Sequence, residues 1–122
     1  MTVRRATGNA FEVAAETHAN THGLVTLDRN VSCRFGEIDL VMRDQGIVVF
    51  AEVRYRDGSR FGGAIASVDV RKQRRMIAAA QLYLQSRPAL SRAPCRFDVF
   101  AIEGDIAAPS IAWIRDAFRV EA

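Results

Sequence analysis

Apolar residues recur along the chain at two periods, which predict different elements. Where they alternate with polar residues, as in residues 96–102, the period of two is typical of a strand. Where they recur every third or fourth residue, as in residues 76–84, the period is that of a helix. The predicted elements are a helix at 9–22, strands at 24–27, 31–43 and 47–55, a helix from 67 or 69 to about 87, and strands at 96–102 and 111–114. This order predicts an α/β fold, an α-β-β-β-α-β-β sandwich with a central mixed sheet flanked by helices.

Turn residues set the predicted boundaries. Gly23 ends the first helix, and Asp28-Arg29-Asn30 form a turn or a bulge after the first strand. Asp44-Gln45-Gly46 predict a hairpin connection in which the glycine is available for a positive φ. Residues 47–51 are apolar on both faces, which is typical of a central strand, and residues 116–118 predict a small terminal turn.

Composition narrows the class of protein. The 122 residues have the size of one ordinary domain, so we expect 1–122 to fold as a single unit. No apolar run approaches the ~20 residues needed to span a bilayer, and the basic N-terminus lacks the apolar segment of a secretory signal. Two cysteines are too few for a disulfide framework. We therefore expect a cytoplasmic protein with reduced thiols and no membrane partner.

Two acids interrupt the apolar strands on either side of the hairpin. Asp39 and Glu52 lie at similar distances from the turn, so neighbouring strands can project both carboxylates to one side. Like charges at that range repel unless a cation lies between them. Hard cations such as Mg²⁺ prefer one or two carboxylates together with water and phosphate oxygens. Arg54 shares the predicted face of Glu52, where it could contact a scissile phosphate.

These acids belong to a set of motifs that resembles a known family. The motifs are F-E-V-A-A-E at 11–16, F-G-E-I-D-L-V at 35–41, V-F-A-E-V-R-Y-R at 49–56, F-G-G-A at 61–64, S-V-D-V-R-K at 67–72, R-F-D-V at 96–99 and D-A-F at 116–118. An acid in one strand followed by Glu-x-Lys in the next resembles the PD-(D/E)XK restriction-endonuclease-like superfamily. More closely, the chain resembles the YraN-type bacterial family, predicted relatives of Holliday-junction resolvases.

The resemblance implies a restriction-endonuclease-like fold and a role for each matching residue. Asp39 and Glu52 match the acids that bind Mg²⁺ or Mn²⁺, and Glu12 matches an acid of the first helix that assists them. The lysine of the motif falls on Arg54, a departure that matters because arginine stays charged and is a poor general base. Three alternatives follow: the metal alone activates water, Lys72 supplies the missing amine, or the site is silent.

A basic helix completes the predicted site. The chain has a net charge of +3, with sixteen arginines and a single lysine, which fits a nucleic-acid partner without requiring one. The polar, glycine-rich segment 56–66 is the kind of loop that often carries function. The residues predicted to contact nucleic acid, which the resemblance implies is structured DNA, are Arg54, Arg56, Arg71, Lys72 and Arg75. Related resolvases act as dimers, so we expect by analogy a possible homodimer.

Simpler interpretations remain open at this stage. Asp39 and Glu52 could be acids of a partly solvated strand face, paired with Arg54, Arg43 or Arg34. The expected function is that of a divalent-metal-dependent endonuclease, or a nucleic-acid-binding protein, acting on phosphodiester bonds in branched or structured DNA. The alternatives are a catalytically silent nucleic-acid-binding module, with Arg54 in place of lysine, and a non-catalytic interaction protein.

Overall fold

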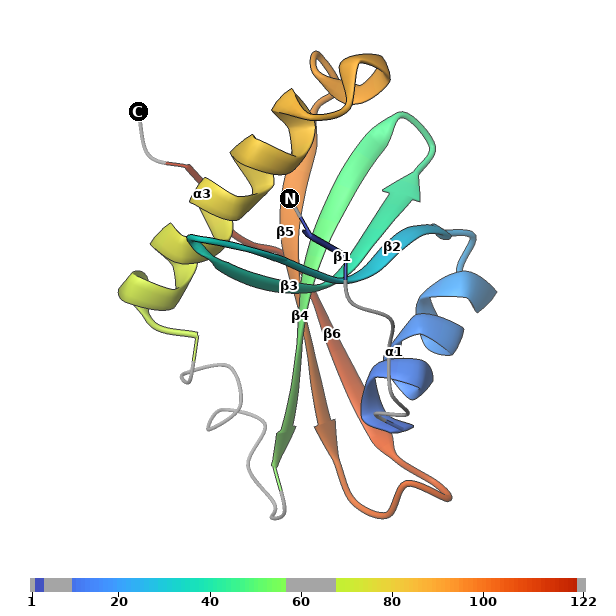
Figure 1. The fold of residues 1–122 in the computed structure, drawn as a ribbon. Helices are drawn as coiled ribbons and strands as arrows, with labels where there is room; N and C mark the ends of the chain where they lie inside the picture. Colours follow the sequence, from blue (N-terminus) through green and yellow to red (C-terminus); the bar gives the residue numbers. More distant parts are fainter. Residues whose placement is uncertain (1, 4–9, 57–67, 121–122) are drawn as a thin grey trace.

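The computed structural model describes residues 2–3, 10–56 and 68–120 (Figure 1). The side chains of Thr2, Val3 and Arg56 lie outside that description. The elements in chain order are β1 (Thr2–Val3), α1 (Ala10–Thr21), β2 (Val25–Cys33), β3 (Gly36–Asp44), β4 (Ile47–Arg56), α3 (Val70–Gln85), the 3₁₀ helix η1 (Pro88–Leu90), β5 (Cys95–Glu103) and β6 (Ser110–Phe118). No helix in the described ranges is long and apolar enough to cross a membrane.

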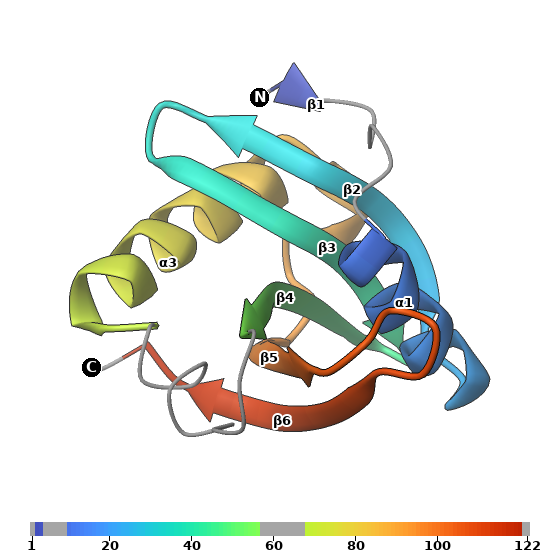
Figure 2. The same cartoon turned by 90° about the horizontal axis from the view of Figure 1, so that it is seen from below.

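The strands form a single mixed sheet in the order β1-β2-β3-β4-β5-β6. Strands β4 and β5 are parallel, joined by a crossover that contains α3, and every other pair is antiparallel. The two helices lie on opposite faces of the sheet (Figures 1 and 2). The predicted α-β-β-β-α-β-β sandwich is confirmed, with the short β1 added at one edge, and it is consistent with the restriction-endonuclease-like arrangement that the resemblance implies.

Alternating side chains along the strands build one core on each face. The core under α3 includes Val41, Phe50 and Val99, and the core under α1 includes Met42, Val49 and Phe100. The stripe predicted for α3 is buried at Met76, Ala79, Ala80 and Tyr83. Because β4 contributes apolar residues to both cores, its predicted central position is confirmed.

Two predicted boundaries in the first half of the sheet are wrong. The strand predicted at 31–43 is two strands, because a two-residue turn at Arg34-Phe35 joins β2 to β3 with Cys33 paired to Gly36. Residues 28–30 lie within β2, next to a register shift between Thr26 and Asp28, so the predicted bulge rather than the turn forms there. In the β3–β4 hairpin the positive φ falls on Gln45 and not on Gly46.

The end of the chain also differs from the prediction. Residues 116–118, expected to form a turn, belong to β6, in which Phe118 pairs with Phe97. Asp116 has a positive φ of 54° where the register shifts, and its backbone N–H donates to Asp98. That hydrogen bond satisfies the backbone at the irregularity, so the strand continues past it. The predicted loop at 56–66 lies largely outside the described residues.

Candidate metal and phosphate site

Strands β3 and β4 place the two predicted acids where their pairing ends. The last paired residues at this end are Leu40 and Ala51, and Asp39 and Glu52 are the next residues outward on the two strands. Oδ2 of Asp39 accepts a hydrogen bond of 2.8 Å from the backbone N–H of Val53. The carboxylate thus satisfies a backbone donor beyond the last pair, and both acids lie at this fork between the strands.

The fork raises the pKa of Asp39 to about 8. Burial is the largest cause, because it disfavours the charged form of the carboxyl group. The second cause is the Glu52 side chain, which lies within hydrogen-bonding reach and adds its negative charge. The N–H of Val53 and the charge of Lys72 act in the opposite direction. The structure therefore brings the predicted pair of acids together as neighbours.

Two cationic side chains converge on the carboxylate of Glu52. Its side chain is almost fully buried, and its Oε2 lies 3.0 Å from Nη2 of Arg54 and 3.2 Å from Nζ of Lys72. Arg54 comes from the same strand, whereas Lys72 comes from α3. The ion pair between Glu52 and Arg54 is the one that the simpler interpretation expected, and the lysine is an addition to it.

Lys72 lies in the first turn of helix α3, which positions it at the site. Asp69 caps the helix, with its side chain accepting a hydrogen bond of 2.9 Å from the backbone N–H of Lys72. The cap fixes where the helix begins, and so fixes which residues face the sheet. Met76, one turn further along, is buried under the sheet. Lys72 therefore emerges at the edge of the core, as its spacing from Met76 predicts.

Arg54 keeps part of its guanidinium unused. Nη2 contacts Glu52, but Nε is buried and has no hydrogen-bond partner among the described residues. A buried donor without a partner costs free energy, and such atoms are rare in folded proteins. The arginine side chain as a whole is 31% exposed, so solvent and ligands reach its outer part, although Nε itself is buried. A phosphate oxygen is a suitable acceptor for a guanidinium, which donates through several N–H groups.

Glu12 approaches the same fork from α1, on the other face of the sheet. The pKa of Glu12 is raised, first by burial and second by the charge of Asp39, and a hydrogen bond with the Asn30 side chain partly opposes the shift. Asn30 belongs to β2 and has a positive φ of 49°. The predicted assisting acid therefore lies close enough to Asp39 for the two charges to interact.

The predicted basic residues divide into two groups. Lys72 and Arg54 lie at the acids, whereas Arg71 and Arg75 are exposed on α3. The side chain of Arg56, the last residue of β4, is outside the described part, so its predicted contact stays a prediction. The sequence thus identified both the inner cations and an exposed basic helix next to them.

One acid on this face was missed. In the parallel pair β4–β5, Arg56 is in register with Glu103, so the alternation of the strands places Glu103 on the face of Glu52 and Arg54. Glu103 is buried, and its Oε1 has no hydrogen-bond partner among the described residues. The fourth long strand was predicted to end at residue 102, one position too early. Every second residue of this strand lies on one face, so extending the series Val99, Ala101 by one more member would have identified Glu103.

The donor set fits a hard divalent cation that keeps much of its water. No group of three or more His, Cys, Asp or Glu side chains converges on one point in the described ranges. Asp39 and Glu52 supply two adjacent carboxylates, and their proximity contributes to the raised pKa of Asp39. Mg²⁺ is bound in this way, through one or two carboxylates with water and substrate phosphate in the remaining positions. A closed structural zinc site would require four protein ligands and does not fit.

Comparison with known proteins identifies relatives along almost the whole chain. The family profile described as "Uncharacterised protein family UPF0102" matches residues 11–102. A UPF0102 protein of Xanthomonas campestris pv. campestris (strain B100) is 50% identical over 118 residues, covering 97% of this chain and 95% of the relative. A UPF0102 protein of Stutzerimonas stutzeri (strain A1501) is 50% identical over 119 residues, covering 98% and 99%. One from Xylella fastidiosa (strain 9a5c) is 52% identical over 118 residues, covering 97% and 96%.

Proposed function

This chain belongs to the uncharacterised protein family UPF0102, and we propose that it is a divalent-metal-dependent endonuclease of the restriction-endonuclease-like superfamily, acting on branched or otherwise structured DNA. The observation that carries the proposal is the fork at which Asp39 and Glu52 meet, with Arg54 and Lys72 on the same carboxylate. Acids, a guanidinium and an amine are the groups that phosphodiester hydrolysis requires in one place.

Asp39 and Glu52 would hold the Mg²⁺ or Mn²⁺ ion, with Glu12 close to Asp39. When bound, such a cation supplies an activated water and stabilises the negative charge that develops on the phosphate. In the hydrolysis, a water oxygen bonds to phosphorus, the bond to the leaving ester oxygen breaks, and a proton from the water ends on that oxygen. The backbone N–H of Val53 keeps the Asp39 carboxylate oriented throughout, because it donates to Oδ2.

Arg54 and Lys72 divide the work that a single motif lysine performs in the resembled superfamily. Arg54 stays charged and its side chain is 31% exposed, so its guanidinium is suited to hold a phosphate oxygen. Lys72 brings an amine to the same oxygen of Glu52 from a different element. This supports the alternative in which α3 supplies the amine missing from the strand. Arg71 and Arg75, exposed on the same helix, would contact the DNA backbone.

Cleavage of a labelled four-way junction tests the proposal. The purified protein with Mn²⁺ is expected to cut the junction, and Asp39→Ala is expected to abolish the cuts. Asp105→Ala provides a matched control, because Asp105 is an exposed acid in the β5–β6 connection. Cutting that persists in Asp39→Ala would reveal a contaminating nuclease and would remove the support for this function.

Two further variants identify the source of the amine. If Lys72 supplies it, Lys72→Gln should lower the cleavage rate by about 10²–10⁴-fold, the usual range for one proton-transferring group. Arg54→Lys should then change the rate little, because an amine is already present. A large gain in the cleavage rate of Arg54→Lys, with no change in the rate of Lys72→Gln, would instead show that the absence of an amine at residue 54 limits the rate.

The second candidate is a catalytically silent nucleic-acid-binding module. Arg54 in the lysine position favours it, because arginine cannot give up its proton. Such a module would bind DNA or RNA with the salt dependence of phosphate contacts and would cut neither, with or without Mn²⁺. Undetectable affinity for both nucleic acids at low salt would contradict the enzyme and the module alike, leaving a non-catalytic interaction protein.

A further inference from the structure

The turn between β2 and β3 carries an exposed aromatic ring beside an arginine. Phe35 is 38% exposed, and the guanidinium carbon of Arg34 lies 4.8 Å from its ring centroid. Gly36 follows with a φ of +151°, a conformation that side-chain-bearing residues rarely adopt and that permits this two-residue turn. The ring is therefore held at the tip of a short hairpin.

This hairpin tip, residues 34–36, lies beside the basic helix of the candidate site. The Cβ of Arg75 lies 3.5 Å from the position that a Cβ on Gly36 would occupy. Both views place the β2–β3 turn next to α3 (Figures 1 and 2). The arginines at the tip, Arg34 and Arg75, are both exposed. They place two cationic groups near the ring, beside one exposed acid, Glu37.

The tip leads directly into β3, the strand that carries Asp39. Asp39 is four residues after Phe35 along β3, which at about 3.3 Å per residue corresponds to roughly 13 Å. That length is close to four base-pair rises of about 3.4 Å in duplex DNA. A nucleotide held at the tip and a phosphate at the acids would therefore be only a few nucleotides apart on one bound molecule.

A single exposed apolar residue is common and by itself needs no explanation. Tyr55, another exposed ring, has its face stacked on Phe11 with 3.9 Å between centroids, and its hydroxyl donates to Gly104 O. Phe35, in contrast, stacks on no aromatic ring among the described residues, and the guanidinium of Arg34 lies over its ring. An apolar protein partner would have to bury those guanidinium groups, whereas a nucleotide offers a flat base to the ring and a phosphate to the arginines.

We propose that Phe35 stacks on an unpaired base of the bound DNA, with Arg34 contacting the adjacent phosphate. This inference rests on the proposed function and names its substrate class: duplex DNA interrupted by unpaired nucleotides, as at a gap, a flap or a branch point. A base in a continuous duplex is already stacked on both sides and has no free face for the ring. Phe35 therefore gives the site its preference for interrupted over continuous DNA.

Binding of two matched DNA molecules tests the role of the ring. One is a continuous duplex, and the other is the same duplex with a short gap that leaves 2-aminopurine unpaired. Phe35→Ala should lose about 5- to 150-fold in affinity for the gapped DNA, the equivalent of one base–aromatic stack, and should bind the continuous duplex as before. The fluorescence of 2-aminopurine should be quenched by the natural protein and not by Phe35→Ala.

Two companion variants distinguish stacking by the flat ring from the effect of apolar bulk, and both from an effect on folding. Phe35→Trp should keep the preference for the gap, whereas Phe35→Leu, which retains an apolar side chain without a flat face, should lose it. All three variants should unfold at the temperature of the natural protein, because the side chain is exposed. If Phe35→Ala unfolds earlier, Phe35→Leu replaces it as the variant without a ring.

The outcomes separate this inference from the function on which it rests. If the natural protein binds and cuts DNA but Phe35→Ala keeps the full preference for the gap, the stacking role is overturned and the nuclease stands. Equal losses on gapped and continuous DNA would overturn it as well, because they would indicate a contact with the duplex backbone. If the natural protein binds neither DNA at low salt, both proposals fail together.

Discussion

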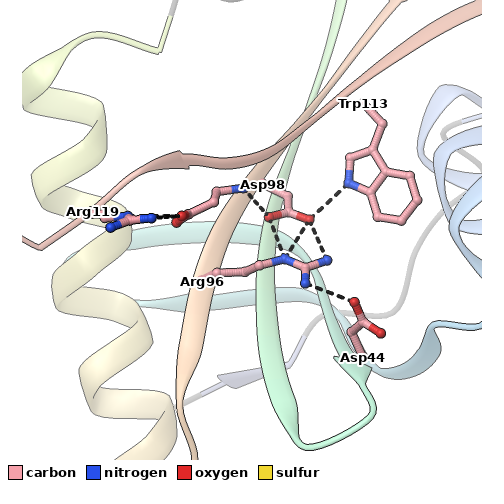
Figure 3. Close-up of polar contacts among 6 residues, drawn as sticks. Asp44, Arg96, Asp98, Trp113 and Arg119 are labelled. Carbon is pink, nitrogen blue, oxygen red and sulfur yellow. Dashed lines mark hydrogen bonds and ion pairs between the residues drawn. The ribbon is translucent and has the colours of Figure 1, made fainter.

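The described residues include two contrasting groups of acids, one on each face of the sheet, and they are built in opposite ways. On the α1 face, Asp98 is fully buried, and its carboxylate accepts hydrogen bonds from three groups (Figure 3). Arg96 Nε donates to it at 3.0 Å, Trp113 Nε1 at 2.9 Å and the backbone N–H of Asp116 at 3.0 Å. Arg96 also donates to Asp44 at 2.9 Å, so the charge of Asp98 is matched and its hydrogen bonds are made.

On the α3 face, the fork leaves its groups incompletely matched. Asp39 accepts a backbone hydrogen bond from Val53 and faces a second carboxylate, that of Glu52. Arg54 and Lys72 both approach the same oxygen of Glu52, and Nε of Arg54 has no partner among the described residues. The same residue types therefore form a closed network around Asp98 and an open one at the fork.

The difference shows how to separate a structural acid from a functional one. A buried carboxylate surrounded by donors holds strands together and has no capacity left for a ligand. At the fork, burial and the neighbouring Glu52 raise the pKa of Asp39, and this unfavourable pairing of two acids is relieved when a cation binds between them. Burial alone does not distinguish the two groups, but the count of donors around each acid does.

The largest expected effect is the loss of the closed network. Asp98→Asn should lower the free energy of unfolding by about 3–5 kcal/mol, because Arg96 and two N–H donors are left with a neutral partner that also presents an amide. Asp39→Asn, the same change at the fork, should leave stability unchanged or increase it, because the new amide can donate to Glu52. Urea denaturation of both variants at neutral pH without metal measures the difference. Equal losses would show that the contrast between the two groups has no energetic basis.

The two groups also differ in how far the sequence predicted them. Asp39 and Glu52 stand out locally, because each is an acid in an otherwise apolar strand, and Lys72 was placed by its helical spacing from Met76. The role of Asp98 could not be predicted, because two of its donors come from β6, whose register and full length no local pattern sets.

The hairpin tip shows a second limit of the sequence. Arg34 and Phe35 lack the Asn-Gly or Asp-Gly signal of a two-residue turn, so one strand was predicted in place of two. The paired strands β2 and β3 and the packing of the tip against α3 override that weak local preference. Topology and helix faces thus followed from periodicity, whereas turns and long-range donors required the folded chain.

The pH dependence of stability is the second way to separate the groups. Well below pH 3.8, the Asp39 carboxyl group is protonated in both the folded and the unfolded chain, and its contribution to stability is complete. As the pH rises toward about 8, the unfolded chain releases this proton while the folded chain retains it, so the free energy of unfolding falls. Above about 8 the decline from this group ends.

Denaturation curves of the natural protein and Asp39→Asn between pH 4 and about 9 isolate the contribution of the Asp39 carboxyl group to the free energy of unfolding. The difference between them should grow in favour of Asp39→Asn as the pH rises, because the variant has no carboxyl group at this position. A difference that stays constant across the range would contradict the raised pKa of Asp39.

Divalent cations should stabilise the fork and not the closed network. Mn²⁺ at about 100 times its dissociation constant should add about 2.7 kcal/mol to the free energy of unfolding of the natural protein, if one ion binds only the folded chain. Glu52→Gln should remove the gain, because one of the two proposed ligands is lost. Thermal unfolding with increasing Mn²⁺ measures it, and Asp105→Ala is the control for adventitious binding to exposed acids. A gain that survives Glu52→Gln would place the ion elsewhere.

The smallest expected effect comes from Glu103, the buried acid that the sequence did not identify. Its Oε1 lacks a hydrogen-bond partner among the described residues, so Glu103 resembles the fork and not Asp98. Glu103→Gln should therefore change the free energy of unfolding by no more than about 0.5 kcal/mol, because no hydrogen bond to Oε1 is lost. Urea denaturation beside Asp98→Asn compares two buried acids. A loss near that of Asp98→Asn would mean that the number of donors around a buried acid does not predict its contribution to the fold.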